Sequence, residues 1–307
     1  CQASGCRPRN DLCATADDSA GPPHHPAFDA GIDFIGRHAA DPQPFCCFVS
    51  TSEPHDPYVP PLSFLARYDL DSVPLSPNLH DDLHGKPEVL RRIQSVWAGL
   101  SEPDWRRVTA AHRAVVTFLD SEVGRLLAAV RRHGLEDRTI VVFTSDHGDM
   151  LGAHGLAAKG VGTAYEEVYN IPLILRVPGL PGGFEEANAC TSLVDLGPTL
   201  LDLADAGVLP EAQGRSLRPV LEGTAEAAAT AALATFDRFI PGPVSWRARR
   251  RTGAPGIRST DGARFHPHWP AWQWRTAPHW PPQPAQWQTW PPECPWAFAR
   301  SNTANPP

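Results

Sequence analysis

The sequence predicts an α/β fold with a mixed, mostly parallel sheet flanked by helices. The run from Thr139 to Phe143 is β-branched and aromatic without a polar face, which is typical of a strand buried on both sides. A second apolar run, from Phe45 to Val49, has the same character. An amphipathic helical pattern from Asp104 to His133 lies between them, and strands that alternate with helices along a chain favour a parallel sheet.

The other elements follow from local patterns. Apolar residues between Phe28 and His38 recur at helical spacing, and Pro42 and Pro44 stop this helix. In the long helical pattern, Asp104 can cap the N-terminus and Gly134 supplies a left-handed stop. Three further elements are expected: a helix over Lys86–Ala98, a buried strand over Pro172–Val177, and an amphipathic helix over Thr191–Ala206.

We divide the chain into three parts. Residues 1–29 are irregular, residues 30–225 carry the predicted helices and strands, and residues 226–307 form a Pro-, Trp- and Arg-rich tail. Residues 241–307 contain eight of the ten Trp, one Val, one Ile and no Leu, so they have too few aliphatic side chains for a packed core. Three interpretations compete: stacking on single-stranded nucleic acid, a Pro-rich linker, or a shifted reading frame in a GC-rich gene. We favour the third and expect the tail to be disordered or frame-shifted.

Composition excludes several classes of function. The net charge of −7 argues against general nucleic-acid binding, although residues 241–307 carry eight Arg against two acidic residues. The seven Cys have no metal-type spacing, and Cys46 and Cys47 are expected to be buried thiols, so no disulfide framework is implied. No apolar run reaches the about 18 residues that a membrane helix needs, and no signal peptide is visible. Because the chain begins at Cys1, cytoplasmic and periplasmic or secreted locations both stay open.

Two polar motifs directly follow predicted strands. Asp146 and His147 follow the Thr139 strand, and His55 follows the Phe45 strand within Ser52–Tyr58. Ligands of open α/β sheets bind at the carboxyl ends of strands, and a carboxylate beside an imidazole can hold a cation. The alternative is a surface turn, because Asp and Gly are ordinary turn residues.

Several separated blocks resemble the sulfatase family of the alkaline phosphatase superfamily. The blocks are FCCFVSTSEPHDPYVPP, SDHGDMLGAHGLAAKG, YEEVYNIPLILRVPG and SLVDLGPTLLDLA, and they occur in the family's order. The resemblance covers about residues 30 to 222 and is to the later part of a sulfatase catalytic domain. It implies an alkaline phosphatase-like fold that is N-terminally truncated.

The resemblance also implies roles for four residues. Asp146 and His147 match the later metal-binding pair of the family, whose metal is generally Ca²⁺, although the ligand types also allow Mg²⁺, Mn²⁺ or Zn²⁺. Lys159 matches a lysine that contacts the sulfate and can protonate the leaving group. His55 matches a substrate-side histidine, which is a sulfate contact and a candidate general acid. For Lys159 the alternative is a solvated surface charge, and for His55 an ordinary loop histidine.

Three neighbouring residues are expected to support the site. Asp149 and His154 lie in the matched stretch and are expected to hold the ligand loop by hydrogen bonds. Tyr58 either lines the substrate pocket or is a packed aromatic.

Other parts of the family's site have no match in this chain. The family's nucleophile is a formylglycine made in a Cys-x-Pro-x-Arg type motif, and no such motif occurs; Cys6–Asn10 has Asn where Arg is required. Neither Asp17-Asp18 nor Asp81-Asp82 matches the family's early metal-binding Asp pair. Gly85-Lys86 lie in the wrong region for its early Gly-Lys element.

We therefore predict a sulfatase-family hydrolase fragment, a sulfuric ester hydrolase by family, whose complete protein cleaves a small-molecule or saccharide sulfate ester with a divalent metal. The chain by itself is expected to be inactive. The alternatives are a phosphonate or phosphate monoester hydrolase of the same superfamily and a non-catalytic metal-binding remnant. No nucleic-acid or membrane partner is expected, and the sequence indicates neither the oligomeric state nor the ester.

Overall fold

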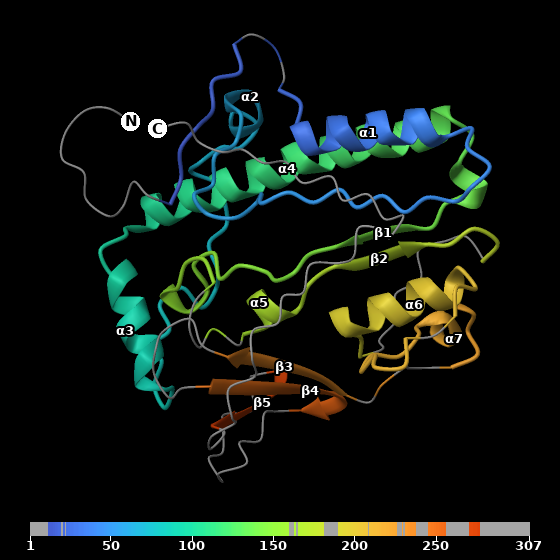
Figure 1. Cartoon of the computed structure of the whole chain (residues 1–307). Coiled ribbons are helices and arrows are strands. Elements are labelled where there is room, and N and C mark those ends of the chain that lie inside the picture. The colour runs from blue at the N-terminus through green and yellow to red at the C-terminus, as the bar shows by residue number, and fades with distance from the viewer. Residues whose placement is uncertain are drawn as a thin grey trace, which may run out of the picture.

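The computed structural model describes residues 12–225 except 20, 22, 160–162, 164, 181–189 and 208, together with residue 229 and strands at 231–237, 245–255 and 270–276. Two long helices lie side by side along one edge of the molecule, with a two-stranded sheet beneath them and a three-stranded sheet beyond it (Figure 1). Most of the predicted helices are confirmed. The predicted sheet is not confirmed.

The helical layer consists of α1 (Pro26–His38) and α4 (Glu102–Arg132), which pack against each other. The N-cap of α4 is Ser101, and not Asp104 as the sequence predicts. Asp104 instead completes a capping box, because its carboxylate accepts from the Ser101 backbone N–H at 2.9 Å. The predicted left-handed stop is confirmed, since Gly134 has φ +65°.

The central sheet pairs β1 (Val141–Thr144) with β2 (Leu173–Arg176) in antiparallel register. The described strands all pair antiparallel, so the mostly parallel sheet is not seen in this part of the chain. The expectation that both strands are buried on both sides is wrong. Phe143 and Ile174 lie directly opposite each other and are 45 % and 55 % exposed.

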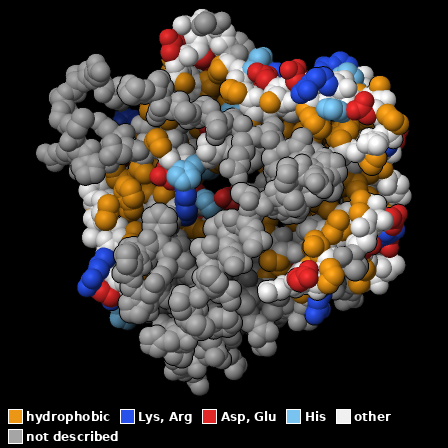
Figure 2. Space-filling view, in the orientation of Figure 1, with side chains coloured by type: hydrophobic (Ala, Val, Ile, Leu, Met, Phe, Trp, Pro, Cys, Tyr) orange, Lys and Arg blue, Asp and Glu red, His pale blue; other side chains and the backbone are white. Residues whose placement is uncertain are grey.

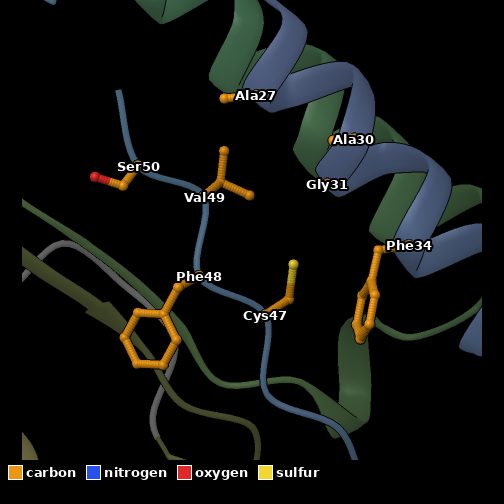
Figure 3. Close-up of a pocket in the computed structure, with 8 residues that line it drawn as sticks. All are labelled: Ala27, Ala30, Gly31, Phe34, Cys47, Phe48, Val49 and Ser50. Atoms are coloured by element: carbon orange, nitrogen blue, oxygen red, sulfur yellow. The ribbon is translucent and has the colours of Figure 1, made fainter. Parts of the chain in front are cut away.

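The prediction of a strand from Phe45 to Val49 is wrong. This segment is extended, but it pairs with none of the described strands. Cys47 and Val49 point toward α1 and Phe48 points away, which is the side-chain alternation of a strand (Figure 3). The segment lies so close to α1 that a Cβ on Gly31 would be 2.6 Å from a methyl of Val49. Cys46 and Cys47 are half-buried thiols whose pKa is raised by burial.

Short helices connect these layers. The helix expected at Lys86–Ala98 is α3 (Glu88–Trp97), and the one expected at Thr191–Ala206 is a 3-10 turn (Leu193–Asp195) followed by α6 (Leu196–Leu203). The others are α2 (Leu62–Leu65), α5 (Glu166–Tyr169) and α7 (Arg218–Leu221), with 3-10 turns at Glu136–Arg138 and Ala153–Gly155. A hydrophobic cluster under the α4 N-terminal half includes Tyr58, Trp105 and Val115.

Parts of the two ends of the chain are described in the structure. Near the N-terminus, Leu12 is buried, and Cys13 and Ala16 form isolated bridges to Tyr58 and Pro61. In the tail the structure has an antiparallel sheet in the order β3 (Ala231–Asp237), β4 (Ser245–Pro255), β5 (Pro270–Thr276). The division of the chain into three parts stays a prediction, and the rest of the tail lies outside the described residues. The shifted-frame hypothesis concerns the gene and stays a prediction.

Within the described residues, none of the helices combines the length and the apolar character needed to cross a bilayer.

Candidate active site

Two segments that are far apart in the sequence build the candidate site. One is the loop Ser52–Tyr58, which follows the extended segment beneath α1, and the other is Ser145–Lys159, which follows β1. Near the centre of the face shown in Figure 2, His, Lys or Arg, and acidic side chains gather between hydrophobic areas. Two side-chain contacts, described next, tie the two segments together.

The first contact is an ion pair between Lys159 and Asp56. Lys159 Nζ donates to Asp56 Oδ1 at 2.8 Å, and both side chains are only partly exposed. Burial raises the pKa of the Asp56 carboxyl, but the hydrogen bond and charge of Lys159, with His55, outweigh burial and hold that pKa below its usual value. His55 lies beside the pair, with Nδ1 3.4 Å from Asp56 Oδ1 and its side chain half exposed. Asp56 therefore brings the two predicted catalytic residues, Lys159 and His55, into one cluster.

The second contact joins Tyr58 to Asp149. The Tyr58 hydroxyl donates to Asp149 Oδ2 at 2.7 Å, and Tyr58 is fully buried. Burial raises the Tyr58 pKa, and the negative charge of Asp149 raises it further, so the phenol keeps its proton. The ring packs edge-on against His112 of α4, whose pKa is lowered by burial. Tyr58 is thus a packed aromatic, and Asp149 holds the loop by this hydrogen bond.

Asp146 and His147 leave β1 at its carboxyl end, as the sequence predicts. Because His147 Nδ1 lies 2.9 Å from the Gly148 carbonyl, which can only accept, the neutral ring has its proton on Nδ1 and leaves the Nε2 lone pair for a cation. That Nε2 is 3.6 Å from Asp146 Oδ2, so an imidazole nitrogen and a carboxylate oxygen lie close enough to bind one cation. The His147 side chain is 35 % exposed and the Asp146 side chain is 83 % exposed, so solvent reaches both.

The pair therefore fits a divalent cation as two of its ligands. Among the described residues, no cluster of three or more His, Cys, Asp or Glu side chains is arranged to hold a metal. Asp56 links Lys159 with His55, and Asp146 lies beside His147. Asp146, His147 and Lys159 belong to the segment Ser145–Lys159, and His55 comes from the loop Ser52–Tyr58.

The segment between the pairs is a closed hairpin. Met150 N donates to the Ala158 carbonyl at 2.9 Å and Gly152 N to the Leu156 carbonyl at 2.8 Å, so the chain returns to place Lys159 near Asp149. Gly148 at its base cannot be replaced without movement, because a Cβ there would lie 2.0 Å from the Glu167 carbonyl oxygen of α5.

Sequence reasoning missed two residues that organise the site. Asp56 adjoins the predicted His55, but nothing in the sequence indicates that it pairs with Lys159, which is 103 positions away. Asp81 was set aside as an unmatched acidic pair, yet its Oδ2 lies 2.6 Å from His154 Nδ1 in the hairpin. No local pattern could reveal that contact, because the two residues are 73 positions apart.

The fold is one that solved sulfatase structures share: BT1596, a 2-O GAG sulfatase, superposes with a TM-score of 0.60 at 23 % identity, covering 73 % of this chain and 52 % of that chain. The sequence profile of the family described as Sulfatase matches residues 9–206, and the chain belongs to the sulfatase family.

Individual relatives give the same result. The chain is 34 % identical over 181 residues to the uncharacterized sulfatase YidJ of Escherichia coli K12, covering 59 % of this chain and 36 % of YidJ. It is 36 % identical over 153 residues to the N-acetylglucosamine-6-O-sulfatase of Bacteroides thetaiotaomicron, and the match covers 50 % of this chain and 26 % of that protein. The structure of the phosphonate monoester hydrolase SpPMH of Silicibacter pomeroyi superposes with a TM-score of 0.59 at 25 % identity. The superposition covers 81 % of this chain and 56 % of SpPMH. The chain thus spans well under half the length of these two curated relatives.

Proposed function

We propose that this chain supplies part of the active site of a metal-dependent sulfatase, a hydrolase that cleaves a sulfate ester. The observation that carries this proposal is the Lys159–Asp56 ion pair beside His55, at the other end of a closed hairpin from Asp146 and His147. This arrangement combines a cation for an anionic group, a candidate acid and two metal ligands. Membership of the sulfatase family supports the reaction class.

Asp146 and His147 would hold the divalent metal, and we propose Ca²⁺ because the carboxylate is a hard oxygen ligand. Mg²⁺, Mn²⁺ or Zn²⁺ are the alternatives that the imidazole allows. When bound, such a cation supplies polarisation of the sulfate oxygens.

Lys159 and His55 would act on the substrate directly. The Lys159 ammonium, held by Asp56, can donate a hydrogen bond to a sulfate oxygen, and a neighbouring cation would favour release of its proton. His55 is half exposed and can donate a proton to the leaving oxygen. Asp56 would orient both groups.

The remaining parts of the site would come from outside this chain. We propose that the complete protein carries a formylglycine nucleophile and two further metal ligands, and that the 307-residue chain alone is inactive. In the complete protein, β1 and the extended segment Phe45–Val49 would join a mostly parallel sheet flanked by helices. The exposed positions of Phe143 and Ile174 support that arrangement.

The substrate class we propose is a sulfated saccharide or small molecule. One relative that matches this chain is an N-acetylglucosamine-6-O-sulfatase, which supports a saccharide ester. A phosphonate monoester hydrolase is the second candidate, because such an enzyme shares the fold at 25 % identity. A non-catalytic metal-binding remnant is the third.

Calorimetric titration of the purified chain with Ca²⁺, Mn²⁺ and Zn²⁺ tests the metal site directly. We expect Asp146→Asn and His147→Gln each to weaken binding of the preferred ion at least tenfold, which is about 1.4 kcal/mol. Asp33→Asn, an exposed carboxylate on α1, is the control and should leave binding unchanged. Equal affinities in all four proteins would exclude the proposed ligands.

Turnover measurements then separate the candidate functions. The chain alone should not hydrolyse 4-nitrophenyl sulfate, and turnover that Asp146→Ala abolishes would contradict the proposed inactivity. For the complete protein, a higher kcat/KM on the sulfate ester than on the matching phenylphosphonate ester supports the sulfatase. The reverse order supports the phosphonate hydrolase, and metal binding without either activity supports the remnant.

A further inference from the structure

The ring of His154 is enclosed at the tip of the hairpin, on the side away from Asp146 and His147. It is 3 % exposed and stacks on Tyr165 with ring centroids 4.3 Å apart. Its polar neighbours, Asn78 and Asp81, come from the loop that precedes α3. The proposed reaction uses none of these groups.

The hydrogen bonds around Asn78 fix the orientation of its side-chain amide. Asn78 Oδ1 accepts from Ser76 Oγ at 2.6 Å and from the His154 backbone N–H at 3.3 Å. The amide nitrogen Nδ2 therefore faces the ring, 2.9 Å from His154 Nε2. Because an amide nitrogen can only donate, Nε2 must accept.

The other ring nitrogen must then carry the proton. His154 Nδ1 is 2.6 Å from Asp81 Oδ2, a carboxylate that accepts the Nδ1–H. The second carboxylate that faces the ring is Glu167, whose Oε1 is 3.9 Å from Nε2 and beyond hydrogen-bond distance. The phenol of Tyr165 stacks on the ring, and its pKa is raised by burial, so it adds no charge.

We propose that His154 is a positioning residue, held as the neutral Nδ1–H tautomer, that pins the hairpin tip to the Asn78–Asp81 loop and so keeps Lys159 against Asp56. The catalytic consequence rests on the role proposed above for Lys159. The tautomer of His154 and the pinning of the hairpin do not depend on that role.

The hairpin backbone requires such a restraint. Leu151, His154 and Ala158 have φ of 41°, 57° and 58°, in a region that residues with side chains rarely adopt. Strained residues persist when surrounding contacts hold them. Gln94 adds one such contact, because its Nε2 donates both to the His154 carbonyl at 2.9 Å and to the Asp81 carbonyl at 2.7 Å.

Nitrogen-15 NMR of the full chain labelled at histidine tests the tautomer. At pH 7 the His154 ring, assigned by the signals lost in His154→Gln, should show a protonated Nδ1 and an unprotonated Nε2. An Nε2–H tautomer or a charged ring in the wild-type chain would overturn the proposal.

A second variant reverses the chemistry at one atom. Asn78→Asp places an acceptor where the amide donated, so His154 should take up a second proton and show the signals of a charged ring at pH 7. Asn78→Ala removes the donor without adding an acceptor and should leave the ring neutral. An uncharged ring in Asn78→Asp would contradict the assignment.

Backbone exchange tests the pinning. In His154→Ala, the amides of Met150 and Gly152, which close the hairpin, should exchange at least tenfold faster, and reductive methylation of Lys159 should accelerate. Asp81→Asn keeps a hydrogen-bond acceptor and should restrain the hairpin nearly as well, while exposed His133→Ala is the control. Unchanged exchange in His154→Ala would overturn the positioning role and would leave the proposed sulfatase function untouched.

Discussion

Lys159 Nζ donates to Asp56 Oδ1 at 2.8 Å, across 103 positions of sequence. The pair holds the end of the hairpin against the His55 loop, so a residue from each of two separate motifs reaches one place. The effect of this ion pair on the stability of the chain can be measured directly.

Acid should weaken this pair. The folded-state pKa of Asp56 lies below the ordinary value, so its contribution to stability is present above about pH 4, where the unfolded carboxyl is ionised, and is lost as pH falls through the folded pKa. We expect Asp56→Asn to lower the free energy of unfolding by about 1 kcal/mol at pH 7, because the pair is only partly buried. Urea titrations between pH 2 and 7 provide the measurement.

The difference between the wild-type chain and Asp56→Asn should shrink steadily below about pH 4. Asp33→Asn, at an exposed site on α1, should show no such dependence. If the difference in free energy of unfolding between the wild-type chain and Asp56→Asn stays constant from pH 7 to 2, the Lys159–Asp56 pair is not its source.

Removing the Tyr58 hydroxyl should lower the free energy of unfolding more than the loss of a single atom suggests. Tyr58→Phe leaves the Asp149 Oδ2 without its buried donor, and a buried polar atom that loses its partner costs about 1–3 kcal/mol. Tyr68→Phe is the matched control, because Tyr68 is less buried and water can replace its bond to Thr117. Thermal unfolding measures the stability of both variants. Equal losses of stability in Tyr58→Phe and Tyr68→Phe would show that the bond to Asp149 contributes no more than the less buried bond to Thr117.

Gly148 offers a test of close backbone approach. Gly148→Ala places a Cβ 2.0 Å from the Glu167 carbonyl oxygen, so α5 or the ligand loop must move, at a cost of about 1–3 kcal/mol or more. Gly124→Ala in α4 meets open space and should instead stabilise the chain by about 0.5–1 kcal/mol through helix propensity. We expect Gly148→Ala to lower the melting temperature and Gly124→Ala to raise it. An unchanged melting temperature in Gly148→Ala would contradict the close approach to Glu167.

The exposed pair on the central sheet should promote self-association. Phe143 and Ile174 are cross-strand neighbours on one face, so together they offer an apolar surface to a second molecule. The double variant Phe143→Thr/Ile174→Thr should scatter less light at high concentration than the wild-type chain. Val116→Thr on α4 removes an equally exposed but isolated apolar residue and should change little.

Helices were predictable because their signals are local. The spacing of apolar residues located α1 and α4, and Gly134 marked the end of α4. The cap was misplaced because Ser101 and Asp104 form a reciprocal pair, and either residue alone is a good N-cap.

Strand burial was not predictable, because it depends on neighbours that a strand's own residues do not specify. An apolar run such as Val141–Thr144 indicates a strand, but its partner here is antiparallel and one of its faces is open. The site residues themselves came from motif order, and their partners Asp56 and Asp81 could be found only in three dimensions.

The long sequence separations at the site have a consequence for how it forms. Helix α4 closes contacts among neighbours, whereas Tyr58 reaches Asp149 across 91 positions and Asp56 reaches Lys159 across 103. Contacts between distant residues are closed late, because the intervening chain must first lose its freedom. During synthesis the His55 loop therefore leaves the ribosome before Asp149 and Lys159, so neither contact can form until the intervening chain has been made.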